Sequence, residues 1–265
     1  MIDQKTESVA GKTCVLISSC DSYSDAWSPF FTLFDRYWPD CDWPIFLLSN
    51  FETWPSDRIH PLAIGEDHSW STNLRIALEE LRPRSIIYLQ EDYFLQNPVD
   101  MQRLSDLNDF ALENGVGYVR LAGSPDPDQA FENPFGLGEL SRETKFRCSL
   151  QGAWWDTDVL LKLLVDDETG WDMEMKGTER AKALPQPFLG VKNDAPLVDY
   201  IFETAILKGR WMPQALRLCR QEGIELDLSR RPVHPQLPLL LKRIRKSRPV
   251  CSVRGFFRNF ARKAG

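Results

Sequence analysis

The first 125 residues alternate short apolar runs with stretches in which apolar residues recur at helical spacing. Apolar runs of this length predict buried strands, and spacings of three and four predict helices that cover them. The predicted strands are Thr13–Ser19, Trp43–Asn50, Ser85–Gln90 and Val116–Leu121, and the predicted helices are Phe30–Tyr37, Ser69–Leu81 with a Ser/Thr cap, and Met101–Asn114. This alternation is typical of a parallel α/β sheet, in which ligands bind beyond the carboxyl ends of the strands.

The pattern is less regular in the second half of the chain. Ser124–Glu143 is rich in Pro, Gly, Asp and Phe and predicts a long loop over the cleft. The elements predicted after it are a strand at Phe146–Trp155, a helix at Thr157–Leu164, a last helix at Tyr200–Lys208 and a short helical stretch at Gln214–Gly223. We therefore expect one α/β domain over residues 1–236, followed by a tail.

Charge sets the tail apart from this domain. The chain has a net charge of −6, yet residues 237–265 contain nine Lys or Arg and no Asp or Glu, interleaved with leucines and phenylalanines. Such a basic amphipathic segment favours the surface of an anionic membrane. RNA binding and a plain solvated tail are the alternatives. Because the rest of the chain is acidic, we expect no nucleic-acid partner.

Composition also bears on location. The chain is 43% hydrophobic and 26% charged, as in ordinary globular proteins, and its longest apolar runs are far shorter than the ~20 residues that span a bilayer. The start of the sequence lacks the apolar stretch of a signal peptide, and its six cysteines form no CxxC pair. We expect a cytoplasmic protein, peripheral on the inner face of the cell membrane.

Two adjacent carboxylates, Glu91 and Asp92, stand where the apolar strand Ser85–Gln90 ends. Burying or crowding them without a cation is costly, so the strand end predicts a site for a metal or a metal-bound diphosphate. Since neighbouring strand residues face opposite ways, only one carboxylate should face the cleft, and we select Asp92 as a ligand for Mg²⁺ or Mn²⁺. An ordinary surface Glu-Asp pair is the alternative.

The order of these features resembles the nucleotide-binding half of a GT-A glycosyltransferase. The resemblance is carried by Ser18-Ser19-Cys20-Asp21 after the first strand, the capped helix at Trp70-Ser71, and Tyr88-Leu89-Gln90-Glu91-Asp92, and it covers about residues 12 to 210. It implies a GT-A-like (Rossmann-like) α/β fold with a mostly parallel sheet flanked by helices. The nucleotide-binding half would be about 12–125 and the acceptor half about 126–236.

The same resemblance implies roles for particular residues. The implied nucleotide-binding residues are Ser19, Asp21, Trp70, Ser71 and Gln90, with positive charge for the diphosphate from Lys208 and Arg210. Asp92 would hold the metal, and His234 is a further candidate for its shell. However, Tyr93 and Phe94 follow Asp92 where the family has a second Asp, so metal independence stays open.

A carboxylate in Trp171-Asp172-Met173-Glu174 resembles the catalytic base of inverting GT-A enzymes, with Glu174 preferred over Asp172. Structural readings stay open for all of these residues: a loop with a helix cap around residues 19–21 and 70–71, a solvated acidic turn at 172–174, and ordinary helix-terminal cations at Lys208 and Arg210.

The resemblance implies a glycosyltransferase that moves a sugar from a nucleotide-diphosphate sugar to a glycan or lipid-linked glycan acceptor. The bacterial enzymes that it resembles in particular assemble surface polysaccharide such as lipopolysaccharide or capsule. One alternative is a nucleotidyltransferase that makes a nucleotide sugar, although Cys20–Asp25 contains no Gly, Lys or Arg. Another is a non-catalytic membrane-bound scaffold with a GT-A-like fold. The chain has no GxxxxGK[ST], GxGxxG, HExxH or GxSxG motif, which removes the main support for kinases, dehydrogenases and hydrolases.

Overall fold

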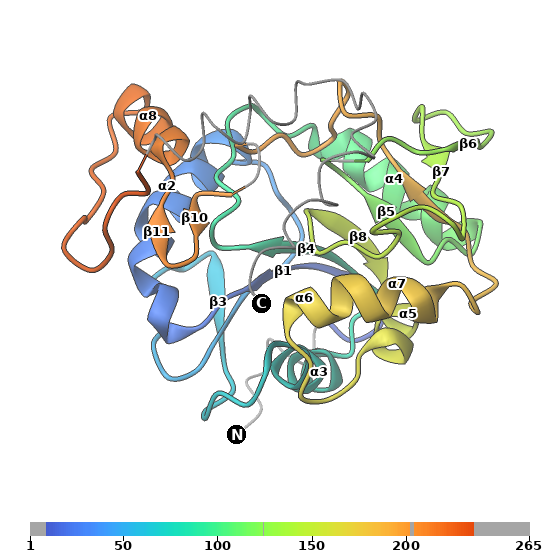
Figure 1. Ribbon diagram of the computed structural model, residues 1–265, viewed down its shortest axis with the longest axis horizontal. Coiled ribbons are helices and arrows are strands. Elements are labelled where there is room, and N and C mark those ends of the chain that lie inside the picture. The colour runs from blue at the N-terminus through green and yellow to red at the C-terminus, as the bar shows by residue number, and fades with distance from the viewer. Residues whose placement is uncertain (1–8, 124, 202–203, 236–265) are drawn as a thin grey trace, which may run out of the picture.

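The computed structural model describes residues 9–123, 125–201 and 204–235, and within them lies a nine-stranded sheet (Figure 1). The strand order is β3-β2-β1-β4-β8-β5-β9-β7-β6. The strands are β1 (Thr13–Ser18), β2 (Ile45–Ser49), β3 (Ile59–Ala63), β4 (Ser85–Gln90), β5 (Tyr118–Arg120), β6 (Gln129–Ala130), β7 (Gly138–Glu139), β8 (Ala153–Asp156) and β9 (Phe188–Gly190). A separate hairpin pairs β10 (Ile206–Leu207) with β11 (Arg210–Trp211).

Helices cover both faces of the main sheet (Figure 1). They are α2 (Trp27–Tyr37), which follows the 3-10 helix η1 (Asp21–Ala26), then α3 (Trp70–Leu81), α4 (Met101–Glu113), α5 (Thr157–Leu163), α6 (Gly170–Asp172), the π-helical turn η2 (Met173–Gly177), α7 (Thr178–Ala181) and α8 (Pro213–Gln221). Along β4, Ile87 and Leu89 belong to the core packed by α2 and α4, while Ile86 and Tyr88 belong to the core packed by α3 and α5. A strand covered on both faces is apolar throughout, as its sequence predicts.

The predicted fold class is confirmed: an α/β protein with a mostly parallel sheet flanked by helices. Strands β1, β2, β3 and β4 are parallel neighbours, and β5 is parallel to β9. The exception near the centre is β8, which runs antiparallel between β4 and β5. The main sheet is therefore continuous across residue 125, because a strand from the second half of the domain is inserted between two strands from the first half.

Three local predictions need correction. The last helix, predicted at Tyr200–Lys208, is wrong: Lys208 and Gly209 have φ angles of 51° and 69° and form the tight turn between β10 and β11. Two successive positive φ angles are what a type I′ hairpin turn requires and a helix cannot contain. The strand predicted at Phe146–Trp155 begins only at Ala153, and two short strands, β6 and β7, lie inside the predicted loop Ser124–Glu143.

Two further elements were not predicted. Strand β3 lies at the sheet edge and contains Pro61, which removes a backbone donor and is tolerated at an edge. The acidic segment before Glu174 continues into one helical stretch from Gly170 to Ala181. The predicted basic tail, residues 237–265, lies outside the described residues. Within the part that is described, no helix is long and apolar enough to cross a membrane.

Candidate functional site

The carboxyl ends of three neighbouring parallel strands meet at one edge of the sheet. Ser18, the last residue of β1, is in register with Leu48 of β2 and with Gln90 of β4. The segments that leave these strands, 19–21, 50–52 and 91–92, therefore lie side by side. This is the edge at which parallel α/β sheets bind their ligands.

At the end of β4 the chain turns, because the Tyr93 N–H donates to the Gln90 carbonyl over 3.0 Å. Both carboxylates inside this turn are buried, with Glu91 only 7% and Asp92 only 9% exposed. The alternation of a strand does not extend into a turn, so the rule that was used to turn Glu91 away from the cleft does not apply here. Two buried carboxylates instead lie close together at the strand end.

The surroundings of this pair disfavour the ionised form of both carboxylates. Burial raises the pKa of Asp92 to about 6, against an ordinary value of 3.8, although Thr204 donates a hydrogen bond to Oδ2. The pKa of Glu91 is raised well above its usual range, first by burial and then by the charge of Asp92. The other oxygen of Asp92, Oδ1, is buried and has no hydrogen-bond partner among the described residues. A buried carboxylate oxygen that accepts no hydrogen bond is suited to binding a cation.

Arg231 is a resident cation whose charge acts on this pair, and the sequence analysis missed it. Its guanidinium is buried over the ring of Tyr23, 4.5 Å from the centroid. Nε and Nη2 donate to the Asp25 carboxylate over 2.6 and 2.8 Å, so Asp25 already takes up most of its charge. Arg231 lowers the pKa of Glu91 and Asp92 only as a minor contribution. No motif marks it, because it is 206 residues from its partner.

The end of β1 holds two residues predicted to bind nucleotide. Ser19 Oγ accepts from Trp27 Nε1 over 2.7 Å and also hydrogen-bonds Glu91. Asp21 Oδ1 accepts the backbone N–H groups of Asn50, Phe51 and Glu52 over 3.0 to 3.2 Å. The Asp21 carboxylate therefore ties the segment after β1 to the segment after β2.

Phe51 is a further candidate that sequence reasoning missed. It follows the strand predicted at 43–50, and its side chain is 68% exposed although its backbone is held by Asp21. An exposed phenyl ring on a backbone that is held at the ligand-binding edge is suited to stacking on a flat ring. The signal in the sequence was an apolar residue directly after a buried strand.

The start of α3 divides its predicted residues into two groups. Trp70 Nε1 and Gln90 Nε2 both donate to the Tyr88 hydroxyl, over 3.0 and 2.9 Å, which places the indole and the amide at the end of β4. Ser71 is buried, and its Oγ accepts the Glu168 N–H over 3.0 Å. Ser69 provides the helix cap by accepting from the Thr72 N–H. Trp70 and Gln90 are thus joined to the strand end, whereas Ser71 is occupied by the acidic segment.

Glu174 and Asp172, the two candidate bases, are in contrasting environments. Asp172 and Thr169 form a capping box, and Lys176 pairs with Asp172 at 2.9 Å. The hydrogen bond from Thr169 is the largest cause that lowers the pKa of Asp172 to about 2. Burial raises the pKa of Glu174, whose Oε1 accepts from the Leu150 N–H over 2.9 Å. A carboxylate with a raised pKa is the better proton acceptor of the two.

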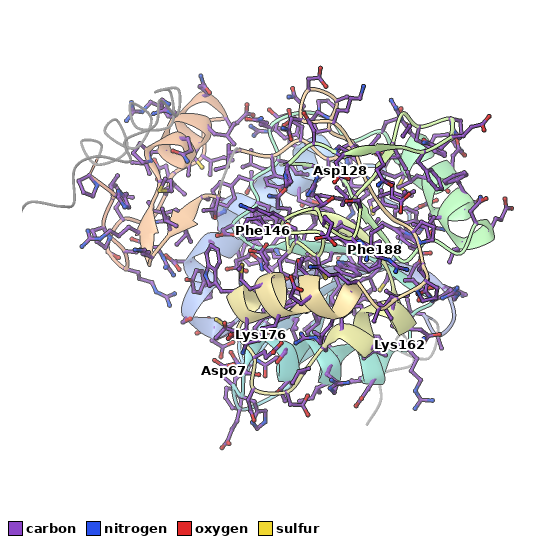
Figure 2. All side chains as sticks on the ribbon, turned by 45° about the vertical axis from the view of Figure 1, so that its right-hand side comes forward. Asp67, Asp128, Phe146, Lys162, Lys176 and Phe188 are labelled. Atoms are coloured by element: carbon purple, nitrogen blue, oxygen red, sulfur yellow. The ribbon has the colours of Figure 1, made fainter. Side chains whose placement is uncertain are left out.

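Glu174 lies in the π-helical turn η2, a feature that is frequent at functional sites. This turn depends on close packing, because a Cβ on Gly177 would meet Met173 Sδ at 2.7 Å. Figure 2 shows the helical stretch from the side, with Lys176 below it and Phe146 above it. On the same stretch the Trp171 side chain is 72% exposed.

A short path joins Glu174 to Asp92. Tyr93, next in sequence to Asp92, donates its hydroxyl to the Leu150 carbonyl over 2.9 Å, and the N–H of the same Leu150 donates to Glu174. Tyr93 also stacks on Tyr200, with ring centroids 4.6 Å apart. Asp92 and Glu174 are therefore linked through Tyr93 and Leu150, although they come from segments 82 positions apart in the sequence.

Lys208 and Arg210 lie at the turn of the β10–β11 hairpin rather than at a helix end, and neither forms an ion pair within the described residues. The hairpin begins beside Thr204, the residue that donates to Asp92. His234 is held to β11 by its N–H, which donates to the Trp211 carbonyl over 2.8 Å. Lys208, Arg210 and His234 therefore lie on or beside a hairpin that begins next to Thr204, the residue that contacts Asp92.

A metal ion at this site would take most of its coordinating atoms from the bound substrate and from water, and few from the protein. Across 9–123, 125–201 and 204–235 no group of three or more His, Cys, Asp or Glu side chains could hold a metal ion. The free Oδ1 of Asp92 nevertheless fits one coordination position of a hard cation. Mg²⁺ in particular is commonly bound by one or two carboxylates, with substrate phosphates and waters completing its shell. The residues therefore fit a metal–diphosphate complex better than a free ion.

The fold and this site define an α/β protein with a mostly parallel, GT-A-like sheet and a buried carboxylate pair at its carboxyl edge. No protein-family model and no curated protein matches the chain. Similar solved structures include S. aureus TarS 1–349, with 10% identity, a TM-score of 0.43, and coverage of 68% of this chain and 60% of that one. TarS 1–349 in complex with UDP gives the same values.

A third similar structure is a cytidylyltransferase from Leptospira borgpetersenii, with 13% identity, a TM-score of 0.49, and coverage of 91% of this chain and 100% of that one. This chain thus spans about three fifths of the length of the TarS structure that it matches.

Proposed function

We propose that this protein is a glycosyltransferase that moves a sugar from a nucleotide-diphosphate sugar to a glycan or lipid-linked glycan acceptor. The observation that supports this most is the buried Glu91–Asp92 pair at the carboxyl end of β4, with Asp92 Oδ1 left without a partner among the described residues. The metal ion of a metal-bound diphosphate would supply the positive charge that this pair lacks. The assignment to surface-polysaccharide synthesis at the membrane follows the sequence resemblance and the basic tail.

In this proposal Asp92 holds the diphosphate end of the donor. A bound Mg²⁺ or Mn²⁺ supplies positive charge to the departing nucleoside diphosphate. The protein keeps Asp92 in place through Thr204 and excludes water from the pair by burial. Lys208 and Arg210 are the candidate cations for the same phosphates if the metal is dispensable.

The nucleoside end of the donor lies along the edge formed by Ser19, Trp70 and Gln90, with Phe51 stacking on the base. Phe51→Ser is expected to raise the KM for the donor about fivefold to tenfold, which corresponds to the loss of one aromatic stacking contact. Because the side chain is exposed, the unfolding midpoint should not change. Donor KM and thermal melting measure the two effects. An unchanged donor KM would remove Phe51 from the site.

Glu174 takes the proton from the acceptor hydroxyl as it attacks the anomeric carbon, which gives inversion. Its raised pKa and its position three residues after the exposed Trp171 support this role. Asp172 is held by Thr169 and Lys176 and serves the helix instead. The exposed indole of Trp171 provides a flat apolar face for the acceptor.

Trp171→Ala is expected to raise the KM for the acceptor about tenfold, since a large aromatic contact surface is lost. Hydrolysis of the donor in the absence of acceptor should not change. Phe51→Ser is the matched control, because it should alter donor KM and leave acceptor KM alone. If Trp171→Ala changes donor hydrolysis instead, the division into donor and acceptor sides is wrong.

The proposal is tested by incubating the protein with UDP-, GDP- and dTDP-sugars, with Mn²⁺, Mg²⁺ or EDTA, and measuring release of the nucleoside diphosphate. We expect turnover of one donor class that is lost in Asp92→Ala. Turnover that persists in EDTA would assign the diphosphate to Lys208 and Arg210. Pyrophosphate release from a nucleoside triphosphate and a sugar phosphate would identify a nucleotidyltransferase instead. If no donor binds, the protein is not a transferase and the non-catalytic scaffold is the remaining interpretation.

A further inference from the structure

Glu168, just before the helical stretch that carries Glu174, is a charged side chain that the proposed reaction does not use. It is 7% exposed, and Arg180 Nη1 and Nη2 donate to its two carboxylate oxygens over 3.0 and 2.7 Å. Burying a charged pair costs much of what its attraction returns. Arg180 Nε adds to this cost, because it is buried and has no hydrogen-bond partner among the described residues. The pair is therefore better suited to fixing a conformation than to adding stability.

The Glu168–Arg180 pair spans the turn that contains Glu174. Glu168 precedes the helical stretch of residues 170–181 and Arg180 lies in its last part, α7, so the π-helical turn η2 lies between the two partners. Arg180 also contacts this turn directly, with Nη2 3.7 Å from Met173 Sδ. A π-turn contains one residue more than an α-turn, and each helical residue turns by about 100°. Loss of the additional residue would rotate Arg180 relative to Glu168, so the pair favours the π-turn.

The backbone of Glu168 is held by the start of α3. Its N–H donates to Ser71 Oγ over 3.0 Å, and its carbonyl accepts the Ser71 N–H over 3.2 Å. Ser71 follows Trp70, whose indole donates to the Tyr88 hydroxyl on β4. Both bonds use backbone groups of Glu168 and do not depend on its side chain. One end of the helical stretch is thus tied to α3, and the ion pair ties the other end to the same point.

The position of Glu174 depends on the turn between these two ends. Its Oε1 accepts the Leu150 N–H over 2.9 Å and the Ser149 hydroxyl over 3.3 Å, both on the segment that leads into β8. A rotation by one helical residue, about 100°, moves a side chain to a different face of the helix. Glu174 would then leave Leu150. For a reacting group, a misplacement of about 1 Å can lower the rate about 100-fold.

We propose that Glu168 is a positioning residue for Glu174: its ion pair with Arg180 holds the π-helical turn in the register that keeps the Glu174 carboxylate at the Leu150 N–H. The proposal rests on the proposed role of Glu174 as the base of sugar transfer. Glu168 acts through Glu174 and is not itself a catalytic residue. Ser71, which the sequence resemblance assigned to nucleotide binding, helps instead to place the base.

The first test is Glu168→Gln in the full chain. This variant should fold, because the amide oxygen can still accept a hydrogen bond from Arg180 and the backbone bonds to Ser71 remain. Single-turnover transfer is expected to fall about 100-fold, while donor affinity stays within about twofold of wild type. Transfer within about threefold of wild type would overturn the proposal.

Glu168→Leu/Arg180→Met separates positioning from stability. Replacing both partners of a buried ion pair by apolar side chains usually leaves stability unchanged or raises it, so the urea midpoint should match or exceed that of wild type. Transfer should nevertheless stay about 100-fold low, because no ion pair then selects the register of the π-turn. If transfer recovers together with stability, the pair is only structural and the proposal is wrong.

The Leu150 amide reports on Glu174 without any substrate. Its hydrogen exchange, measured by NMR, should be about tenfold faster in both variants, since its bond to Glu174 is lost. Unchanged exchange in both variants would overturn the proposal whatever the activity. If the wild type transfers no sugar, the proposed function fails, and the Leu150 amide still decides whether Glu168 positions Glu174.

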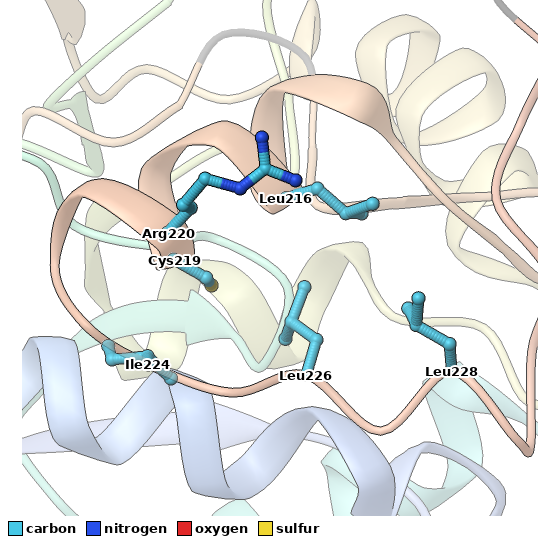
Figure 3. A pocket seen from close by; sticks show the side chains of 6 residues that line it. All are labelled: Leu216, Cys219, Arg220, Ile224, Leu226 and Leu228. Atoms are coloured by element: carbon cyan, nitrogen blue, oxygen red, sulfur yellow. The ribbon is translucent and has the colours of Figure 1, made fainter.

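Two other charged residues provide matched controls. Asp166, two residues before Glu168, forms an exposed ion pair with Arg75 of α3 at 2.8 Å, and exposed pairs contribute little. Arg220 lies on α8 beside an apolar hollow of about 220 Å³, which suits a methionine (Figure 3). Asp166→Asn and Arg220→Met should leave transfer and Leu150 exchange within about twofold of wild type. An equal loss of transfer in the controls would overturn the proposal, because removal of any charge would then have the same effect.

Discussion

Asp92→Asn is expected to reduce donor turnover by about a thousandfold or more while leaving the protein folded. The carboxylate would hold a metal ion that in turn binds the diphosphate of the donor, and loss of such a contact costs several kcal/mol of transition-state stabilisation. Asparagine keeps the shape of the side chain and can still accept the hydrogen bond from Thr204. Turnover of the preferred donor, measured at saturating metal, checks the prediction. Turnover within tenfold of wild type would refute the role of Asp92.

The same substitution should make the protein more stable at neutral pH. A pKa of about 6, against an ordinary value of 3.8, means that ionised Asp92 destabilises the fold at pH 7 by about 2–3 kcal/mol. Since the folded-state pKa is raised, this cost is nearly absent below about pH 4, grows as pH rises from 4 to 6, and is fully present above pH 6. The advantage of Asp92→Asn in urea unfolding should therefore be large at pH 7 and small at pH 4.5.

A control on the same edge should behave in the opposite way. Asp25→Asn removes the charge that Arg231 binds through two hydrogen bonds, so a buried guanidinium loses its counter-ion. We expect destabilisation of about 3 kcal/mol at pH 7. If both substitutions destabilised the protein, the Glu91–Asp92 pair would be a structural network and not a strained ligand site.

Glu174→Gln is expected to lower sugar transfer by about 10² to 10⁴, the usual contribution of a general base. Donor binding should stay within twofold, because Glu174 contacts Leu150 and Ser149 and not the strand end itself. Single-turnover transfer and donor affinity distinguish these effects. Asp172→Asn is the matched control two residues away: it should retain transfer but make the protein slightly less stable, because the capping box is lost.

The pH dependence of transfer provides a second measurement on Glu174. Burial raises its pKa, so the carboxylate is protonated, and unable to accept a proton, at a higher pH than an ordinary glutamate. Transfer should rise with pH through that raised pKa and level off above it. Glu174→Gln should lose this acidic limb along with its activity. An unchanged limb in the variant would assign the titration to another group.

Much of the first half of the fold was predictable because its signals are local. A strand buried on both faces, such as β4, must be apolar throughout, and the capping serine and apolar spacing of α3 are contained in one short segment. The carboxylates after β4 were noticeable for the same reason: charge directly after a buried strand. These features depend only on residues that are close together in the chain, so the sequence alone is enough to predict them.

The errors arose where tertiary contacts outweigh local preference. Residues 200–208 have helical spacing, but the Lys208–Gly209 turn pairs Ile206 with Trp211 and forms a hairpin. The helical stretch at 170–181 is stabilised by Glu168, which binds Arg180 in two hydrogen bonds and Lys176 in an ion pair, and by the capping box of Thr169. The edge strand β3 depends on pairing with β2 and not on its own pattern.

The sequence by itself determined the α/β class, the central strand β4 and the position of the carboxylates at its end, since burial and local spacing are encoded residue by residue. Only the tertiary structure decided how the site is composed. It brought Arg231 onto Asp25 from 206 positions away, left Asp92 Oδ1 without a partner among the described residues, and separated Glu174 from Asp172 by burial. Charge, burial and hydrogen bonding at a site depend on which distant segments pack together, and no single stretch of sequence contains that information.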